Sequence, residues 1–433
     1  MKNNLKRLIK KLLLVFFLLI MYSYALVITN LPDELVVFEG ETIFMKTLLG
    51  LNIKLNDETI ETSSNSSQSL TKQAGKSTLE VSLFDSINIK NVNVDVLPKT
   101  TVIPVGNIAG VKLYTNGVLV VGMSEIEGYD NKKYKPYENK GIKEGDTIVK
   151  IDEKLINSTE DLIETVNNSQ GRDIKVQYIH QEETKECSIS PVKTSNSQYK
   201  LGLWVRDSAA GVGTVSFYEP TSKTFGALGH GITDIDTNEL INIASGEFVT
   251  TRILNITKGE SGNPGKIQGT VENQTNIGKI YKNSKFGIYG KVDNISSLNI
   301  DMSKEMEVAL REEIKTGKAR ILCSLDNQQP QEYEIEIEKI NKENNYDNKS
   351  MQIKITDQKL LEKTGGIIQG MSGSPVIQNG KFVGAVTHVL VNDPTTGYRC
   401  ICRYDVKTNK RSKLKNTHML QKTCEYFFYG KRE

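Results

Sequence analysis

The sequence has few cysteines, and their arrangement predicts neither a zinc site nor a disulfide framework. The five cysteines, an odd number, are Cys187, Cys323, Cys400, Cys402 and Cys424. Their spacings match no common set of zinc ligands. Cys400 and Cys402 alternate as residues on one face of a strand do. We therefore expect small buried side chains here, with no metal and no cofactor.

An excess of charge of one sign is also missing. The chain carries 55 Lys and Arg residues against 52 Asp and Glu residues, which argues against a nucleic-acid partner. Aromatic residues are scarce, at 7%, whereas glycine and runs of Val, Ile and Thr are frequent. This composition predicts a mainly β protein with many turns. At 433 residues, two or three domains are expected.

Only one long apolar run is present, and it lies at the start of the chain. A basic leader, residues 1–11, precedes the uncharged residues 12–28. Such a pair is typical of an export signal, and a buried helix is disfavoured because the run has no polar face. Ser23-Tyr24-Ala25 suits signal cleavage, and the run is also nearly long enough to span a bilayer. A cleaved signal peptide and a signal anchor in residues 1–28 both stay open. Either places the rest of the chain outside the cytoplasm.

Two regions follow the leader. Residues 29–99 are expected to form a small β-rich region, with strands at 35–38 and 92–96 and no chemistry of its own. Residues 100–192 contain strand-like segments and a helix predicted over residues 158–167. Asn157 or Ser158 is its expected N-cap. Its apolar stripe comprises Leu162, Ile163 and Val166.

This second region resembles the PDZ domains found in bacterial proteases, most specifically in the run from Gly141 to Asp152. The resemblance implies a groove that binds an extended peptide by strand addition. It also implies that backbone amides of Ala109, Gly110, Val111 and Lys112 receive the carboxylate of a chain end. A domain that serves only as a spacer is the alternative.

A glycine-flanked serine stands out in the last region, residues 193–433. It is Ser372, within Gly370-Met371-Ser372-Gly373-Ser374-Pro375. Small neighbours let the backbone turn sharply and leave amide groups free to face an oxyanion. The motif predicts a nucleophile with the amides of Gly370 and Ser372 as oxyanion donors, whereas a plain turn is the alternative.

A serine nucleophile needs a base, and His230 is the candidate. It is one of four histidines and lies between Gly229 and Gly231 after an apolar strand. A carboxylate would orient the imidazole. Asp234, Asp236, Asp301 and Asp357 are available for this role. Asp357 is favoured, since it ends a predicted strand just before the serine loop.

The serine motif resembles that of chymotrypsin-like peptidases, and the order His, Asp, Ser matches. This implies a double β-barrel. Met371 replaces the acidic residue that pairs with a freed N-terminus in those enzymes. The closer resemblance is to the stage IV sporulation signalling peptidases (the SpoIVB family), through residues 225–234, 370–375 and 384–394. It covers nearly the whole chain and places the family's triad on His230, Asp357 and Ser372.

The resemblance implies an exported serine endopeptidase, acting between the forespore and mother-cell membranes. Its expected partners are itself, through self-cleavage, a membrane-bound regulator of an intramembrane protease, and the membrane that holds its N-terminal segment. Cleavage of the regulator would activate a late sigma factor. The alternative is a catalytically inactive exported PDZ adaptor, which the presence of His230, Asp357 and Ser372 argues against.

Overall fold

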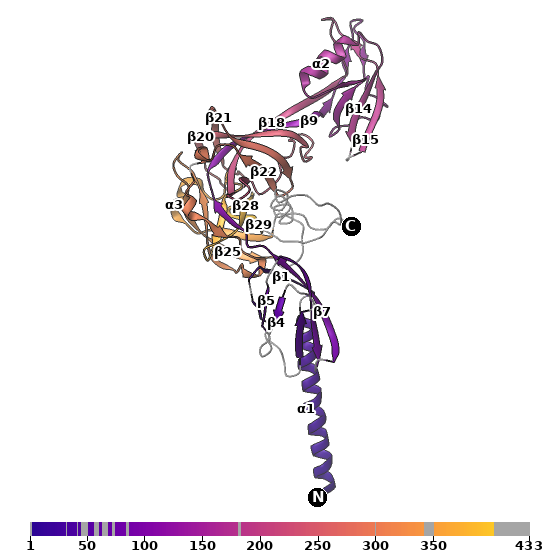
Figure 1. Ribbon diagram of the computed structural model, residues 1–433. Helices are drawn as coiled ribbons and strands as arrows, with labels where there is room; N and C mark the ends of the chain where they lie inside the picture. Colours follow the sequence, from indigo (N-terminus) through magenta and orange to yellow (C-terminus); the bar gives the residue numbers. More distant parts are fainter. Residues whose placement is uncertain are drawn as a thin grey trace. The chain divides into compact units, whose positions relative to one another are not determined.

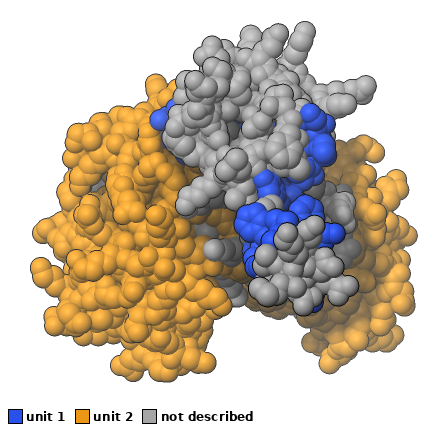
Figure 2. Space-filling model, turned by 90° about the horizontal axis from the view of Figure 1, so that it is seen from below, with its two compact units in different colours: residues 1–100, 406–411 blue, residues 101–405, 412–433 orange. Residues whose placement is uncertain are grey.

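The computed structural model describes residues 2–31, 33–40, 42–44, 51–55, 60–62, 68–71, 74–83, 86–180, 183–298, 300–341 and 350–401. The chain forms two compact units, one of residues 1–100 and one of residues 101–405, drawn in blue and orange in Figure 2. Cys402, Cys424 and the basic tail from Lys407 lie outside the described residues.

The first unit begins with helix α1 (Lys2–Asn30). No glycine or proline precedes Pro32, so nothing interrupts the helical hydrogen bonds, and Pro32 disfavours continuation of the helix. The stretch Ile9–Leu26 is long and apolar enough to cross a membrane. Its large side chains are mostly exposed. An apolar N-terminal helix is thus present, as the sequence predicts.

The rest of the first unit is a small β region. Its main sheet has the order β1-β7-β6-β3. Alternating residues Val92, Val94 and Val96 of β7 point into the core of this sheet, as strand periodicity requires. The strands of the unit are β1 (Glu34–Phe38), β2 (Thr42–Phe44), β3 (Leu51–Leu55), β4 (Ile60–Thr62), β5 (Gln68–Thr71), β6 (Gly75–Leu83) and β7 (Ile87–Leu97).

The second unit contains a first β-barrel, a ring of six strands. Pairing runs β9-β20-β21-β22-β19-β18, and β18 pairs again with β9, which closes the ring. In its core the rings of Phe225 and Phe248 stack with centroids 4.6 Å apart. The strands are β9 (Ile108–Met123), β18 (Leu203–Glu219), β19 (Thr224–Ala227), β20 (Ile243–Thr257), β21 (Lys266–Ser284) and β22 (Gly287–Val292).

A second barrel follows, closed in the order β24-β25-β26-β29-β28-β27. When the strands of each barrel are numbered along the chain, both rings read 1-2-3-6-5-4. Two barrels of the same strand order confirm the predicted double β-barrel. The second comprises β24 (Gly317–Cys323), β25 (Gln331–Ile340), β26 (Met351–Ile355), β27 (Pro375–Gln378), β28 (Lys381–Leu390) and β29 (Asp393–Ile401), with helix α3 (Gln358–Thr364).

The PDZ domain is inserted between the first two strands of the first barrel. β9 and β18 run on from the barrel into the PDZ domain (Figure 1). There the outer end of β9 pairs with β12. A separate core there includes Val118, Ile148 and Val176. This domain contains the outer ends of β9 and β18 with β10 (Ile126–Glu127), β11 (Lys133–Tyr134), β12 (Thr147–Ile151), β13 (Lys154–Leu155), α2 (Thr159–Asn168), β14 (Ile174–His180), β15 (Glu183–Ile189), β16 (Val192–Lys193) and β17 (Tyr199–Lys200).

Helix α2 confirms most of its sequence prediction. Ser158 is the N-cap, because its side chain accepts a hydrogen bond from the amide of Asp161 at 3.1 Å. Leu162 and Val166 are buried. Ile163, which was predicted to lie in the same apolar stripe, is instead 52% exposed.

The boundaries between these domains differ from those predicted. Residues 103–113, assigned from the sequence to the PDZ domain, belong to the core of the first barrel. The physical reason is that β9 is one continuous strand shared by two cores. The remaining short elements of the unit are β8 (Thr101–Pro104), β23 (Met306–Glu307) and the 3₁₀ helices η1 (Ile295–Leu298), η2 (Met302–Lys304) and η3 (Arg311–Glu313).

Candidate active site

Ser372 lies in a tight turn before β27. The turn depends on Gly370 and Gly373, whose φ angles of +100° and +98° favour glycine. A Cβ atom on Gly373 would lie 2.0 Å from the carbonyl oxygen of Thr214 on β18. Met371 is fully buried, whereas Ser372 is half-buried. The turn therefore presses against the first barrel and leaves the serine partly accessible.

The hydroxyl of Ser372 lies at the seam between the two barrels. Its Oγ is 2.8 Å from the carbonyl oxygen of Leu228, just after β19, and 2.9 Å from that of Thr387 on β28. Both carbonyls accept, so the single hydroxyl proton is held by one of them. In this conformation the serine is near the loop of His230 but is not hydrogen-bonded to it.

His230 follows β19, two residues after Leu228, and is half-buried. Its Nδ1 lies 2.8 Å from the carbonyl oxygen of Gly231. A carbonyl only accepts, so Nδ1 carries the proton and Nε2 is left as the basic nitrogen. Burial lowers the pKa of His230, although the bond to Gly231 acts in the opposite direction. A neutral imidazole is the form that can accept a proton from serine.

A second histidine lies beside the first. The rings of His230 and His388 have centroids 5.4 Å apart, so β28 of the second barrel contributes an imidazole to the site. His388 is exposed and directly follows Thr387, whose carbonyl oxygen faces Ser372. No role was assigned to His388 from the sequence, although it lies in one of the stretches on which the family resemblance rests.

The structure does not bring Asp357 to His230. Its carboxylate caps α3 by accepting from the amide of Leu360 at 3.0 Å, and it also accepts from that of Glu334 at 3.4 Å. Among the described residues, no hydrogen bond or ion pair joins Asp357 to His230. Its role as the triad carboxylate stays a prediction that rests on the resemblance, and this conformation gives the side chain a capping role.

The other candidate carboxylates are also engaged elsewhere. Asp234 and Asp236 form ion pairs with Arg206, and Asp301 caps η2.

The turn between β21 and β22 lies beside His230, because the carbonyl oxygen of Lys285 in this turn accepts a hydrogen bond from the amide of Gly231. In the described ranges, no group of three or more His, Cys, Asp or Glu residues is arranged to hold a metal ion.

The two backbone N–H groups predicted to bind the oxyanion do not donate to another group in the described structure. Gly370 and Ser372 make no backbone N–H hydrogen bond within the part of the chain that the structure describes. The neighbouring amides of Met371 and Gly373 are used, because they donate to Ile368 and Val386. Two backbone N–H groups of this turn, those of Gly370 and Ser372, are therefore available to donate hydrogen bonds to an oxyanion.

The predicted peptide-binding residues of the PDZ domain are placed elsewhere. Ala109, Gly110, Val111 and Lys112 lie in the middle of β9, paired with β18 on one side and β20 on the other. Their segment is an interior strand of the first barrel, where the ladders occupy both edges. The structure therefore contradicts a carboxylate-binding role for these four residues.

A free strand edge occurs instead at the start of β18. Residues 203–206 pair with β9 alone in the described structure. The opposite edge faces α2, because the amide of Thr159 donates to Asp207 at 2.8 Å. Ile163 lies one helical turn beyond Thr159, on the same face. A strand edge that lies beside a helix fits peptide addition. Leu201 and Gly202, which directly precede this edge, were not assigned a binding role from the sequence.

Comparison with known proteins agrees with this organisation. Residues 197–404 match the family model of the SpoIVB peptidase S55, and residues 111–190 match that of the PDZ domain. No curated protein matches the chain.

Two solved structures are similar to parts of it. The PDZ domain of the SdrC-like protein from Listeria monocytogenes is 20% identical, with a TM-score of 0.17, and the match covers 21% of this chain and 87% of that domain. The inactive form of the Rv3671c protease is 15% identical, with a TM-score of 0.23, over 43% of this chain and 77% of that protein.

The S55 match begins at residue 197, beyond the end of the PDZ match at residue 190, and includes both His230 and Ser372. It ends beyond the last strand of the second barrel. Residues 197–404, just under half of the chain, therefore match the SpoIVB peptidase S55 family, and the chain is a serine peptidase with a PDZ domain.

Proposed function

We propose that this protein is an exported, membrane-anchored serine endopeptidase that acts during endospore formation. It cleaves itself and a membrane-bound regulator of an intramembrane protease, which leads to activation of a late sigma factor. The observation that carries the enzymatic part is the position of Ser372, between Leu228 and Thr387 at the seam of two barrels and beside the loop of His230. The sporulation role rests on the match of residues 197–404 to the SpoIVB peptidase S55 family.

In the proposed mechanism, Ser372 attacks the scissile carbonyl and His230 accepts its proton at Nε2. The protonated imidazole then gives the proton to the leaving amine. The amides of Gly370 and Ser372 stabilise the oxyanion, and Asp357 is the carboxylate that the resemblance assigns to His230. The Ser372 hydroxyl must first turn from the carbonyls of Leu228 and Thr387 toward His230. Apo geometries of catalytic serines are often loose in this way.

The location of the protein follows from α1. The stretch Ile9–Leu26 would span the membrane, with the basic residues before it left in the cytoplasm. Both barrels and the PDZ domain would then lie on the outer face, in the space between the forespore and mother-cell membranes. The exposed apolar side chains of this helix support the proposal.

Covalent labelling tests the enzymatic proposal directly. We expect a biotinylated fluorophosphonate to modify Ser372 of the purified full chain, and peptide mapping by mass spectrometry to find no label on Ser374. Ser374 is fully buried, whereas Ser372 is half-buried. Label on Ser374, or none on a folded protein, would favour an inactive adaptor.

The PDZ groove gives a separate prediction. We propose that a peptide with a free carboxylate adds to the β18 edge beside α2. Ile163→Glu should then weaken binding about tenfold or more, because a charge would replace an exposed apolar contact in the groove. Titration can be followed by fluorescence of Trp204, the only tryptophan, which lies on this strand and is 64% exposed.

Leu155→Glu is the matched control for Ile163→Glu. Leu155 is 64% exposed on β13, in the same domain. The probe is a mixture of synthetic peptides that end in Val, Leu or Phe with a free carboxylate. Equal affinity of the two variants would place the groove elsewhere.

A further inference from the structure

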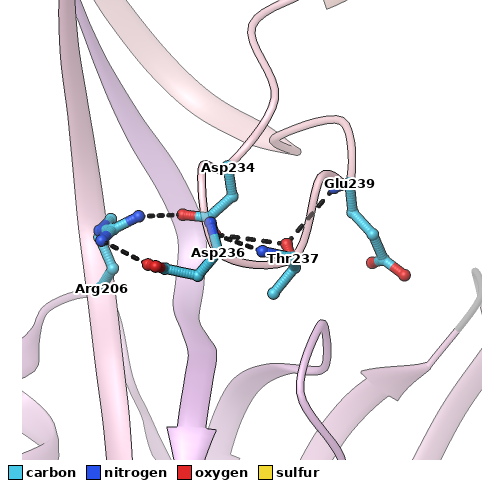
Figure 3. A network of polar contacts seen from close by, with 5 residues as sticks. All are labelled: Arg206, Asp234, Asp236, Thr237 and Glu239. Carbon is cyan, nitrogen blue, oxygen red and sulfur yellow. Dashed lines mark hydrogen bonds and ion pairs between the residues drawn. The ribbon is translucent and has the colours of Figure 1, made fainter.

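The hairpin that follows His230 is held to β18 by an ion pair in which the carboxylate of Asp234 is buried. Arg206 of β18 bonds to the carboxylate of Asp234, and its second nitrogen donates to Asp236 at 2.8 Å (Figure 3). Asp234 is only 1% exposed. A buried carboxylate without a partner is costly, so Arg206 and Asp234 constrain each other.

Asp234 also organises the turn of this hairpin. Its carboxylate accepts from the amides of Asp236 at 3.0 Å and Thr237 at 3.1 Å. Burial would raise the pKa of Asp234, but the amides of Thr237 and Asp236 and the guanidinium of Arg206 outweigh it, and the pKa is lowered. The side chain is therefore a charged acceptor that shapes the turn and fixes it to β18.

The base of the hairpin is fixed by a different group. Asn283 of β21 accepts from the amide of Ile232 at 2.9 Å and donates to the carbonyl oxygens of Ile232 at 2.8 Å and Ile241 at 2.9 Å. The hairpin thus has two attachments. Asn283 holds it to the barrel next to His230, and Arg206 holds its turn.

The contact between Arg206 and the turn of the hairpin lies next to the PDZ domain. Arg206 immediately follows Val205 on the free edge of β18. On the other arm of the turn, Glu239 packs against Gly145 of the PDZ domain. A Cβ atom placed on Gly145 would lie 2.9 Å from the Oε2 atom of Glu239. Hence the hairpin after His230 is held between its own barrel and the inserted domain.

We propose that Arg206 is a positioning residue for the peptidase reaction: by tying Asp234 and Asp236 to β18, it holds the loop that carries His230 in its catalytic place. This inference rests on the proposed catalytic roles of His230 and Ser372. Arg206 itself does not touch the reacting atoms. Arg206 would affect His230 indirectly, because His230 is directly joined to the hairpin that Arg206 holds.

The test compares Arg206→Gln, Arg206→Lys and the double variant Arg206→Gln/Asp234→Asn, in the full chain with labelled casein as substrate. The double variant removes both charges, so it leaves no unpaired buried carboxylate and separates stability from positioning. We expect kcat to fall about tenfold to a hundredfold in Arg206→Gln and in the double variant, with KM within about twofold. Arg206→Lys should recover part of kcat.

A pH profile supplies a second readout. A loosened loop exposes His230 to water, so its lowered pKa should move back toward 6.5, and the acid limb of kcat/KM should shift to higher pH. His388, whose ring faces His230, is unchanged in every variant. Melting temperatures are measured alongside.

The outcomes separate this inference from the proposed function. Wild-type kcat and an unshifted acid limb in a folded double variant would overturn the positioning role while the enzyme itself stays active. Absence of casein cleavage by the wild-type protein, in contrast, would contradict the proposed function. A rate that falls only in step with melting temperature would also overturn the inference.

Discussion

Ser372→Ala is expected to lower kcat on casein by on the order of 10⁴-fold or more, because it removes the nucleophile while leaving the turn intact. The backbone of Ser372 would keep its bond to Thr214, whose amide donates to the serine carbonyl at 2.9 Å. The variant should therefore fold normally. Accumulation of uncleaved full-length chain in the variant, measured by gel electrophoresis over time, would also test self-cleavage.

Ser374→Ala is the matched control, two residues away in the same motif. The Oγ of Ser374 is buried and has no hydrogen-bond partner in the described structure. Its removal should leave kcat within about twofold and should not destabilise the fold, since an unsatisfied buried hydroxyl contributes nothing to stability. A large loss of activity in Ser374→Ala with activity retained in Ser372→Ala would reverse the assignment.

The substitution His230→Gln is also expected to have a large effect and to lower kcat by on the order of 10⁴-fold. The loss should not add to that of Ser372→Ala, because the two residues act in one proton transfer. Glutamine keeps the size of the side chain but cannot accept a proton at neutral pH. A double variant no slower than either single variant would be the expected sign of a shared step.

The wild-type pH profile tests the same residue. The base works as neutral imidazole, and its pKa is lowered by burial, so kcat/KM should fall only below pH 6.5. The sign for stability follows from linkage: the pKa of His230 is lower in the folded chain than in the unfolded chain, so the unfolded chain binds the proton first. Stability therefore falls once the pH drops below the unfolded pKa and continues to fall until the pH has passed the lower folded pKa. An acid limb centred above pH 6.5 would exclude His230 as the group that controls the rate.

Local motifs made much of the site predictable. The glycines near Ser372 and His230 reflect local turns, since Gly229, Gly370 and Gly373 have positive φ angles. Helix α2 and its cap were predictable for the same reason, since a serine followed by an apolar stripe is a short-range signal. The two barrels were predicted from the resemblance of the serine motif to that of chymotrypsin-like peptidases.

Non-local features were not predictable from one sequence. Residues 109–112 read as the start of a PDZ domain, yet pairing with β20, far along the chain, makes them barrel strand. Asp357 was assigned from its place near a strand end, whereas its contacts depend on β25. Arg206 and Asp234 form an ion pair although they lie 28 residues apart in the sequence, and no spacing rule connects them.

The insertion of one domain into another also affects how the chain folds. The first barrel cannot close until β18 has arrived beside β9, and the whole PDZ segment separates them in sequence. A long unstructured connection would make that closure entropically costly. If the inserted domain folds first, it brings the outer ends of β9 and β18 together as a paired ribbon, from which the barrel strands extend. The PDZ domain would thus template the barrel, and the peptidase domain would form only after it.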